Sequence, residues 1–457
     1  MMCLIFGIQN LYAEDISVNS SEQLTSAFHK ASPGTRIVLL PGIYNVYRLD
    51  TYSGGTAQQP ITVEAEILGT ALIHATGSEV ISIHHSHWIV KGLTLEGSSQ
   101  SDHAFHISGN ADNVIIKQNT LVNFHSQIKV NGDSQSFPDN GLIENNDIFN
   151  TKIRETDQPV TSIDIVGGKN WIIRGNYIAD FAKKFSDKTS YGIFIKGNST
   201  NGLIEKNLVI CAKDTVNGVR IGMSFGGGGT GTPYCEDRNC NIEHTGGIMR
   251  NNVILNCSDV GIYLNKAHDS VIANNTLLMT AGIDVRFPKS NAIIKNNILT
   301  GAIRERDGGR AEIQKNVMFG TRFGMWLPTI SDKLQHRISD YDSKFPRWIN
   351  RENIEKAQTL IGNFFSFVEQ TSLGLGKNKT QDCFPELIIG DIKPDKTICG
   401  AFWQSDERTS DTLEDFWGNK RLAGQNVMGA IDFYHSTCNI IDRIQHKPIK
   451  ISSSCLD

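Results

Sequence analysis

The sequence has no apolar run long enough to cross a membrane and no excess of positive charge. Its 457 residues carry a formal net charge of -4, and 20% of them are charged. The lack of a basic field argues against a nucleic-acid partner, and the lack of a long apolar run argues against membrane insertion. Affinity for an acidic ligand must therefore come from a local cluster of basic side chains.

The N-terminal residues 1–13 are apolar but lack the basic start that a signal peptide normally has. They end in the small residue Ala13, directly before the polar residues Glu14 and Asp15. Either the true start lies upstream, or this segment is a weak, truncated signal peptide. In both cases we expect a secreted or periplasmic protein.

Cysteine occurs nine times, but no two cysteines have the C-x-x-C spacing of a zinc site. Removal of a leader that contains Cys3 leaves eight, an even number that suits an oxidising compartment. Cys211 and Cys257 end comparable strands and could stack on neighbouring rungs. The spacing predicts local disulfides within the pairs Cys235 and Cys240, Cys383 and Cys399, and Cys438 and Cys455.

Long apolar helical runs are also missing. Instead, short segments with the pattern of a β-strand, here called β phrases, repeat along the chain. Clear examples are 191–196, 217–222, 260–265, 281–286 and 301–306, which carry β-branched or leucine side chains mostly at alternate positions. Many of these phrases are followed by a second short strand that ends near an asparagine. The asparagines, 19 to 45 residues apart, are Asn119, Asn146, Asn176, Asn207, Asn252, Asn275, Asn297 and Asn316.

This repeat predicts a stacked solenoid, and its short β phrases favour a parallel β-helix over a helical repeat. Asparagine suits a corner because it tolerates left-handed backbone angles and its amide can bond the rungs on either side. We therefore predict an all-β fold, a right-handed single-stranded parallel β-helix over residues 14–320. The asparagines are expected to be structural.

Both ends of the solenoid have features of caps. Residues 20–31 predict a helix with Ser21 as its N-cap, which would cover the first rung with the apolar face of Leu24, Ala27 and Phe28.

The repeat fades after Asn316, and we expect residues 321–457 to form an irregular C-terminal cap. Within it, residues 415–421 and 429–432 resemble a final strand pair that returns to the solenoid.

The residues between the apolar positions of each rung should point outward from one sheet. Alignment of the rungs predicts a first outward column of His106, Lys129, Asp164, Phe194, Arg220, Tyr263, Asp284 and Arg304. The second column is Ser108, Asn131, Val166, Lys196, Gly222, Asn265, Arg286 and Arg306. A cationic row with an aromatic residue suits a long anionic glycan, although charged residues also occur on an ordinary solvated face.

The longest interval between asparagines contains an insertion between Met223 and Gly246. Four glycines, 226–229, are followed by the Cys235 to Cys240 loop, which together resemble an active-site wall. A phosphate cradle is disfavoured because neither a helix nor a Lys-Ser/Thr pair follows the glycines. His244 is a candidate acid or base, although a lone histidine is more often structural.

Three phrases resemble the alginate lyase and chondroitinase B family of β-helix polysaccharide lyases. They are Asn-Gly-Val-Arg-Ile-Gly at 217–222, Tyr-Leu-Asn-Lys at 263–266 and Gly-Ile-Asp-Val-Arg-Phe at 282–287. The family has an Asn-Gly…Ile-Arg-Ile-Gly phrase, an acidic strand ending in Asn-Lys-Ser, and a Leu-Arg-His-Gly phrase one rung on. Residues 33–39 and 55–62 are similar to the same group, so the resemblance extends over residues 20–320.

The resemblance implies a lyase that cleaves an acidic, uronate-containing polysaccharide by β-elimination. By position, the family's general base is Lys266 and its partner acid is Arg286. Calcium, which neutralises the uronate carboxylate in the family, would be held by Asp259, with Asn217 and Arg220 nearby.

The sequence departs from the family pattern at two positions near these residues. Gly261 stands where a second calcium carboxylate is expected, and Phe287 replaces the histidine that follows the arginine. The glycine-rich loop has no counterpart in the family.

β-Elimination needs a neutralised carboxylate, a base for the C5 proton and an acid or cation at the leaving oxygen. A lysine can serve as the base only when nearby positive charge lowers its pKa. In this scheme the substrate-binding residues are Lys196, Tyr263, Asp284, Arg304 and Asn265.

Two other functions fit the same residues. A β-helix glycosidase or epimerase could use carboxylates such as Asp164 and Asp284, and hydrolysis would require them roughly 5–9.5 Å apart. A non-catalytic glycan-binding or surface structural protein would need no such pair. In each case we expect a monomer.

Overall fold

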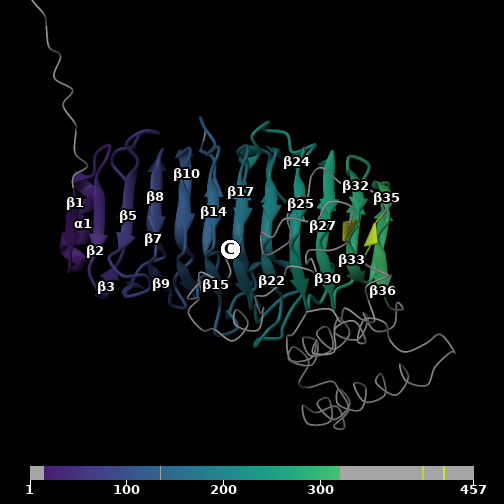
Figure 1. Cartoon of the computed structure of the whole chain (residues 1–457), viewed down its shortest axis with the longest axis horizontal. Helices are drawn as coiled ribbons and strands as arrows, with labels where there is room; N and C mark the ends of the chain where they lie inside the picture. The colour runs from purple at the N-terminus through teal and green to yellow at the C-terminus, as the bar shows by residue number, and fades with distance from the viewer. Residues whose placement is uncertain (1–14, 134, 320–403, 406–425, 428–457) are drawn as a thin grey trace, which may run out of the picture.

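The computed structural model describes residues 15–133 and 135–319, together with the short segments 404–405 and 426–427. From residue 15 to residue 319 the chain winds as a solenoid, which Figure 1 shows from its N-terminal helix to the strand β35. Successive strands pass in turn to three long sheets, and each pairing within these sheets is parallel. The prediction of a right-handed parallel β-helix is confirmed.

The strand bounds show the repeat. The twelve-stranded sheet contains β1 (Asp15–Val18), β2 (Arg36–Leu39), β5 (Ile61–Ala65), β8 (Trp88–Lys91), β11 (Ile115–Lys117), β14 (Leu142–Glu144), β17 (Ile172–Arg174), β21 (Leu203–Glu205), β25 (Ile248–Arg250), β29 (Ser270–Ala273), β32 (Asn291–Lys295) and β35 (Arg310–Gln314). The ten-stranded sheet contains β4 (Leu49–Asp50), β7 (Glu79–His85), β10 (His103–Asn110), β13 (Ile128–Asn131), β16 (Thr161–Val166), β19 (Ser190–Lys196), β23 (Arg220–Phe225), β27 (Ile262–Asn265), β31 (Gly282–Arg286) and β34 (Ala302–Arg306). The eleven-stranded sheet contains β3 (Gly42–Val46), β6 (Ala71–Ala75), β9 (Thr94–Glu96), β12 (Thr120–Val122), β15 (Asp147–Phe149), β18 (Tyr177–Ala179), β22 (Leu208–Ile210), β26 (Val253–Leu255), β30 (Thr276–Leu278), β33 (Ile298–Thr300) and β36 (Val317–Phe319).

The core is built from apolar rows that run along the solenoid axis. Because parallel strands lie about 4.8 Å apart, a residue on one rung contacts its register partner on the next. Full burial of each such side chain stabilises the fold by about 1.5–3 kcal/mol. The inward row of the ten-stranded sheet is Leu49, Ile81, Phe105, Ile128, Ile163, Ile193, Met223, Ile262, Ile283 and Ile303.

The predicted asparagines form a continuous hydrogen-bonded ladder at one corner. The Nδ2 of Asn119 donates to the Oδ1 of Asn146 at 3.1 Å, and the same contact continues rung by rung to Asn316. The left-handed backbone angle, however, belongs to the residue before each ladder asparagine, such as Gln118 with φ 56°. The amide thus satisfies buried backbone groups of the corner, while its neighbour makes the bend.

The N-terminal cap is the helix α1 (Ser21–Lys30). Its N-cap is Ser20 rather than Ser21, since the Ser20 side chain accepts from the backbone N–H of Gln23. The predicted apolar face is correct, because Leu24, Ala27 and Phe28 are buried. The Phe28 ring stacks on Trp88 with centroids 5.3 Å apart, which joins the helix to the core.

A small sheet of β20 (Ser199–Thr200), β24 (His244–Thr245) and β28 (Ala267–His268) follows one edge of the ten-stranded sheet. Its His244 is fully buried and stacks on the Phe225 ring at 4.1 Å. The Nε2 of His244 accepts the backbone N–H of Gly202 at 3.3 Å. Burial lowers the pKa of His244 to about 3, so the ring is neutral in the folded protein.

The expected strand pair at 415–421 and 429–432 lies outside the described residues. The described part of this region contains one antiparallel pair, β37 (Gln404–Ser405) with β38 (Asn426–Val427). None of the described helices is both long enough and apolar enough to cross a membrane.

Replacement of Asn275 by Leu should lower the free energy of unfolding by about 1–3 kcal/mol, because buried polar groups lose their partners. These partners include the carbonyl of Met249 and the amides of Asn252 and Asn297. Urea denaturation at neutral pH measures the change. The matched control is Asn45→Leu on the exposed face of β3, which should change stability by less than about 0.5 kcal/mol. Equal effects of both substitutions would contradict a stabilising ladder.

His244 should make the protein less stable in acid. The unfolded histidine takes up a proton near its ordinary pKa of 6.5, whereas the folded one does so only near 3. Stability is therefore lost as the pH falls below 6.5, by about 2 kcal/mol between pH 7 and pH 5. Urea denaturation at both pH values should show a smaller loss for His244→Gln, which cannot titrate. An unchanged pH dependence in this variant would show that His244 is not the cause.

Candidate functional site

The outer face of the ten-stranded sheet carries a row of polar and aromatic side chains along the solenoid. The predicted first column is correct from His106 to Phe194 and from Tyr263 to Arg304. Between Phe194 and Tyr263, however, the register partner is Ser224, not the predicted Arg220. We call this series of register partners, from Asp50 and Ser82 through His106 to Arg304, the central row.

The misplaced residues of the two predicted columns have one cause. The sequence alignment placed Arg220 opposite Phe194. In the structure Arg220 pairs with Ser190 and Phe194 pairs with Ser224, so the register of β23 differs from the alignment by four residues. A strand keeps its inward and outward alternation when it moves by an even number of residues, so the pattern could not reveal the shift. By the same shift, Gly222 of the second column does not lie beside Lys196, because Ile195 pairs with Phe225.

Arg220 and Asn217 therefore do not lie on the central row. Arg220 is 2% exposed, and its Nη1 donates to the carbonyl of Thr215 at 3.1 Å. Asn217 bonds to its own loop and to that of the preceding rung, since its Oδ1 accepts from the N–H of Gly218 and its Nδ2 donates to the carbonyl of Lys184.

The C-terminal end of the row is rich in arginine. The carboxylate of Asp284, only 1% exposed, accepts from the Nε of Arg304 at 2.5 Å and from the Nη1 of Arg306 at 2.6 Å. Arg286 is held by Asp307, and this hydrogen bond, followed by one to Tyr263, raises the pKa of Arg286 above its ordinary value. These arginine side chains remain 34–42% exposed, so part of each guanidinium reaches solvent.

Tyr263 joins this end of the row to its neighbours on β27 and β31. The Tyr263 hydroxyl oxygen accepts from the Nη1 of Arg286 at 3.3 Å and from the Nδ2 of Asn265 at 3.1 Å. The ring packs against Ile221 and Val260, and the side chain is 7% exposed. The structure thus brings together Tyr263, Asn265 and Arg286, as the sequence predicted.

Lys266 follows β27 at the corner that leads to β28. Its backbone is left-handed, with φ 54°, and its side chain is half-buried. The Nζ of Lys266 lies 3.5 Å from the carbonyl oxygen of Cys240, which belongs to the inserted loop. The candidate base is therefore next to both the sheet and the loop.

The glycine run lies against the outer face of the sheet. A side-chain Cβ at Gly226 would lie 2.0 Å from the carbonyl oxygen of Asn265, and one at Gly227 would lie 2.1 Å from the Phe194 ring. Only glycine allows the backbone to approach this closely. Lys196 completes this part of the site, with its Nζ 4.3 Å from the Phe194 ring centre.

Glu243 ends the inserted loop and lies between two lysines. It is 1% exposed and accepts from the backbone N–H of Gly197 at 3.0 Å. Burial raises the pKa of Glu243, although the hydrogen bond from Gly197 and the charges of Lys196 and Lys266 act in the opposite direction. The sequence analysis did not single out Glu243, because the only feature that pointed to this residue was its position next to His244. His244 itself points into the core and not toward the row.

The residues assigned to calcium by the resemblance do not form a suitable set of ligands. The Oδ1 of Asp259 accepts from the N–H of Val260, and burial, followed by the charge of Asp284, raises the pKa of Asp259. Gly261 contributes no ligand, and Asp284 is already neutralised by two arginines. No group of three or more histidine, cysteine or acidic side chains in the described segments is arranged to hold a metal ion. We therefore derive no step through calcium.

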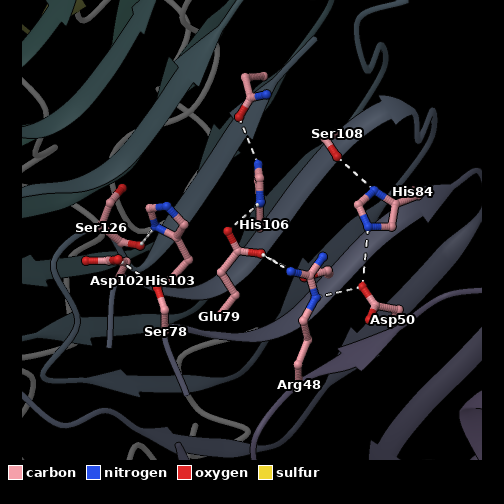
Figure 2. Close-up of polar contacts among 12 residues, drawn as sticks. Arg48, Asp50, Ser78, Glu79, His84, Asp102, His103, His106, Ser108 and Ser126 are labelled. Atoms are coloured by element: carbon pink, nitrogen blue, oxygen red, sulfur yellow. Dashed lines mark hydrogen bonds and ion pairs between the residues drawn. The ribbon is translucent and has the colours of Figure 1, made fainter. Parts of the chain in front are cut away.

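The N-terminal end of the row carries a second polar cluster, which Figure 2 shows. His84 lies between Ser108, whose Oγ is 2.8 Å from its Nδ1, and Asp50, whose Oδ1 is 3.5 Å from its Nε2. His106 contacts Glu79 at 3.0 Å, and this hydrogen bond is the main reason that the pKa of Glu79 falls to about 2. Apart from His106 and Ser108, the sequence alignment missed these residues because it did not extend the outward columns to β4 and β7.

Two disulfides are present, one within the inserted loop and one between consecutive rungs. Cys235 is bonded to Cys240, as predicted, and Cys211 to Cys257 on the neighbouring rung. The predicted pairs Cys383–Cys399 and Cys438–Cys455 lie outside the described residues.

Peptide mapping without reducing agent should find both described disulfides closed in protein from its native compartment. Closure is expected because the Cα atoms lie 4.8 and 5.6 Å apart, within the usual range for disulfides. Alkylation of the unreduced protein serves as the control for free thiols. Labelled cysteines at these four positions would contradict both the pairing and export.

Two parts of the chain match the models of known protein families. Residues 18–171 match the model of the family described as chondroitinase B. Residues 236–333 match the family described as the periplasmic copper-binding protein NosD. The chain has no match among curated proteins.

Several solved structures are similar to the solenoid. Pectate lyase Pel9A is 12% identical, with a TM-score of 0.51 over 67% of this chain and 80% of that one. The alginate lyase of Paenibacillus sp. str. FPU-7 is 16% identical, with a TM-score of 0.45 over 67% of this chain and 96% of that one. The A-module of the Azotobacter vinelandii mannuronan C-5 epimerase AlgE4 is 12% identical, with a TM-score of 0.40 over 67% of this chain and 93% of that one. This chain thus has the parallel β-helix fold of pectate lyase Pel9A and is similar over residues 18–171 to the chondroitinase B family.

Proposed function

We propose that the outer face of the ten-stranded sheet binds an acidic polysaccharide and that the protein cleaves it by β-elimination, outside the cytoplasm. The observation that carries this proposal is the arginine-rich end of the central row, with Lys266 at its border. The match of residues 18–171 to the chondroitinase B family supports the reaction class. The two disulfides and the match to a family described as periplasmic support export.

The arginines suit a substrate that carries carboxylates. Each guanidinium has five N–H donors, and the contacts to Asp284 or Asp307 use only part of them. Arg286, Arg304 and Arg306 lie on the consecutive strands β31 and β34, where partly exposed forks can hold a carboxylate through paired hydrogen bonds. An uncharged polymer would gain far less from this arrangement.

The same arginines supply the first requirement of β-elimination. Their positive charge stabilises the uronate carboxylate and the enolate-like charge that grows on it as the C5 proton leaves. Lys266 is the proposed base for that proton, because its Nζ lies at the border between the sheet and the inserted loop. The net positive charge of the site is limited by three carboxylates, those of Asp259, Asp284 and Asp307. The site therefore keeps affinity for the polymer without excessive repulsion among its basic groups.

Hydrolysis by the two carboxylates considered above finds no support in the geometry. Asp164 lies on β16 and Asp284 on β31, four strands apart in the ten-stranded sheet. At about 4.8 Å per step, their backbones are roughly 19 Å apart. A hydrolase needs its two carboxylates within roughly 5–9.5 Å. Asp164 is moreover paired with Lys129 at 2.5 Å.

The test uses a panel of alginate, chondroitin or dermatan sulfate, pectate and other uronate polymers. Wild-type protein should release an unsaturated product that absorbs in the near ultraviolet. A metal chelator should change the rate little, because arginines, not calcium ligands, surround the reaction site. Binding without product would favour a glycan-binding protein, and saturated products would favour hydrolysis or epimerisation.

Lys266→Ala should lower turnover by 10² or more, the usual scale for loss of a general base. Arg286→Lys should also be severe, because a point charge cannot replace a bidentate fork. Circular dichroism should show both variants folded.

The matched control is Lys117→Ala, a similarly half-buried strand lysine on the twelve-stranded sheet, which should retain activity within about twofold. Near-full activity of Lys266→Ala on a polymer that the wild type cleaves would contradict the assignment of the base.

A further inference from the structure

We infer that Tyr263 is the general acid of this site and donates its phenolic proton to the glycosidic oxygen that leaves during cleavage. The inference rests on the proposed function and deepens it. It also changes the role that the resemblance gives to Arg286, from the proton donor to the residue that positions and stabilises the donor.

Tyr263 occupies a fixed place in the central row. On β27 it lies between Ser224 of β23 and Asp284 of β31, and the arginine pair that holds Asp284 is on β34, one strand beyond β31. Its ring is packed against Val260 and Ile221, so the hydroxyl has little freedom to move. Lys266, the proposed base, is three residues further along the chain.

The hydrogen bonds around Tyr263 determine where its proton points. A guanidinium has no acceptor, so Arg286 must donate to the hydroxyl oxygen. The Nδ2 of Asn265 donates to the same oxygen. A phenolic oxygen has two lone pairs and one proton, and both lone pairs are thus occupied. Within residues 15–133 and 135–319 no acceptor takes the Tyr263 proton, which is therefore available to a ligand on this face.

Arg286 is suited to support this donor and poorly suited to replace it. A guanidinium does not lose a proton in proteins, and Asp307 raises the pKa of Arg286 further. Its positive charge, together with the Asn265 amide, stabilises the negative charge that develops on the Tyr263 oxygen as the proton leaves. Phe287, in place of the histidine of the family pattern, stacks on this guanidinium at 4.7 Å and offers no proton.

The proposed step is balanced without a further reactant. Lys266, as the free amine, takes the C5 proton, and the electrons of the C5–H bond form the C4=C5 double bond. The C4–O4 bond breaks, and its electron pair stays on O4, which takes the proton of Tyr263. Lys266 then holds an extra proton and Tyr263 lacks one. Transfer through solvent restores both residues.

The experiment compares two leaving groups with Tyr263→Phe, which keeps the ring and removes the proton. One substrate is the uronate polymer that the wild type cleaves, whose leaving oxygen needs protonation. The other is a uronate glycoside with a nitrophenoxide at C4, which leaves readily as an anion. Tyr263→Phe should lose 10² or more in kcat on the polymer with little change in KM, yet stay within about threefold of wild type on the nitrophenoxide.

Two controls separate the acid from the other roles. Lys266→Ala should be slow on both substrates, because each requires removal of the C5 proton. Tyr47→Phe, on a residue 74% exposed in the first rungs of the solenoid, should leave both rates unchanged.

Equal losses of Tyr263→Phe on both substrates would overturn the inference, since a purely structural role does not depend on the leaving group. Full activity of Tyr263→Phe on the polymer would overturn it as well and would leave the lyase assignment intact. If wild-type protein acts on neither substrate, the proposed function fails and the inference fails with it.

Discussion

Hydrogen bonding between consecutive rungs is the constraint on which this structure depends. It fixes each residue about 4.8 Å from its register partners, so an outward residue always has two side chains as neighbours on its own face. A run of like charges at this spacing would be unstable. The central row avoids it by interleaving, since Asp284 lies between the uncharged Tyr263 and the cation Arg304, and Lys129 lies beside Asp164. Beside this row Arg286 and Arg306 are register partners, and each is paired with a carboxylate, that of Asp307 or Asp284. The outer face of the ten-stranded sheet is thus ordered by the same pairing that holds the core together.

Much of this arrangement could be predicted from the sequence because both the core and the corners repeat. Alternation identified the rungs, and the asparagines marked one corner at each turn. Once β27, β31 and β34 were aligned, their register placed Tyr263, Asp284 and Arg304 side by side, and Asn265 beside Arg286. A period-2 pattern does not determine the register of a strand, however. An even shift of a strand preserves every inward and outward assignment, which is why Arg220 was placed on the row that Ser224 occupies.

Other features depend on contacts that no periodicity encodes. Whether Glu243 or His244 faces the site is decided by the path of the inserted loop, which buries His244 against Phe225 and brings Glu243 to Gly197. The glycines were visible in the sequence, but their purpose required the neighbours, because Gly226 and Gly227 allow the backbone to lie on Asn265 and Phe194. The ladder asparagines were predicted correctly as structural, yet the left-handed angle belongs to the residue before each of them.

The two ends of the central row differ in how their charges are paired, so the two ends of this face offer different groups to a ligand. At the N-terminal end, Glu79 is bonded by His106, Ser82 and Arg48, so donors and acceptors largely satisfy one another. At the C-terminal end, three arginines share the two carboxylates Asp284 and Asp307, which leaves donors and a positive charge in excess. A polymer along the sheet would therefore meet groups suited to hydroxyls first and groups suited to a carboxylate last. The proposed β-elimination, which requires a neutralised carboxylate, is therefore assigned to that second end, where Tyr263 and Lys266 also lie.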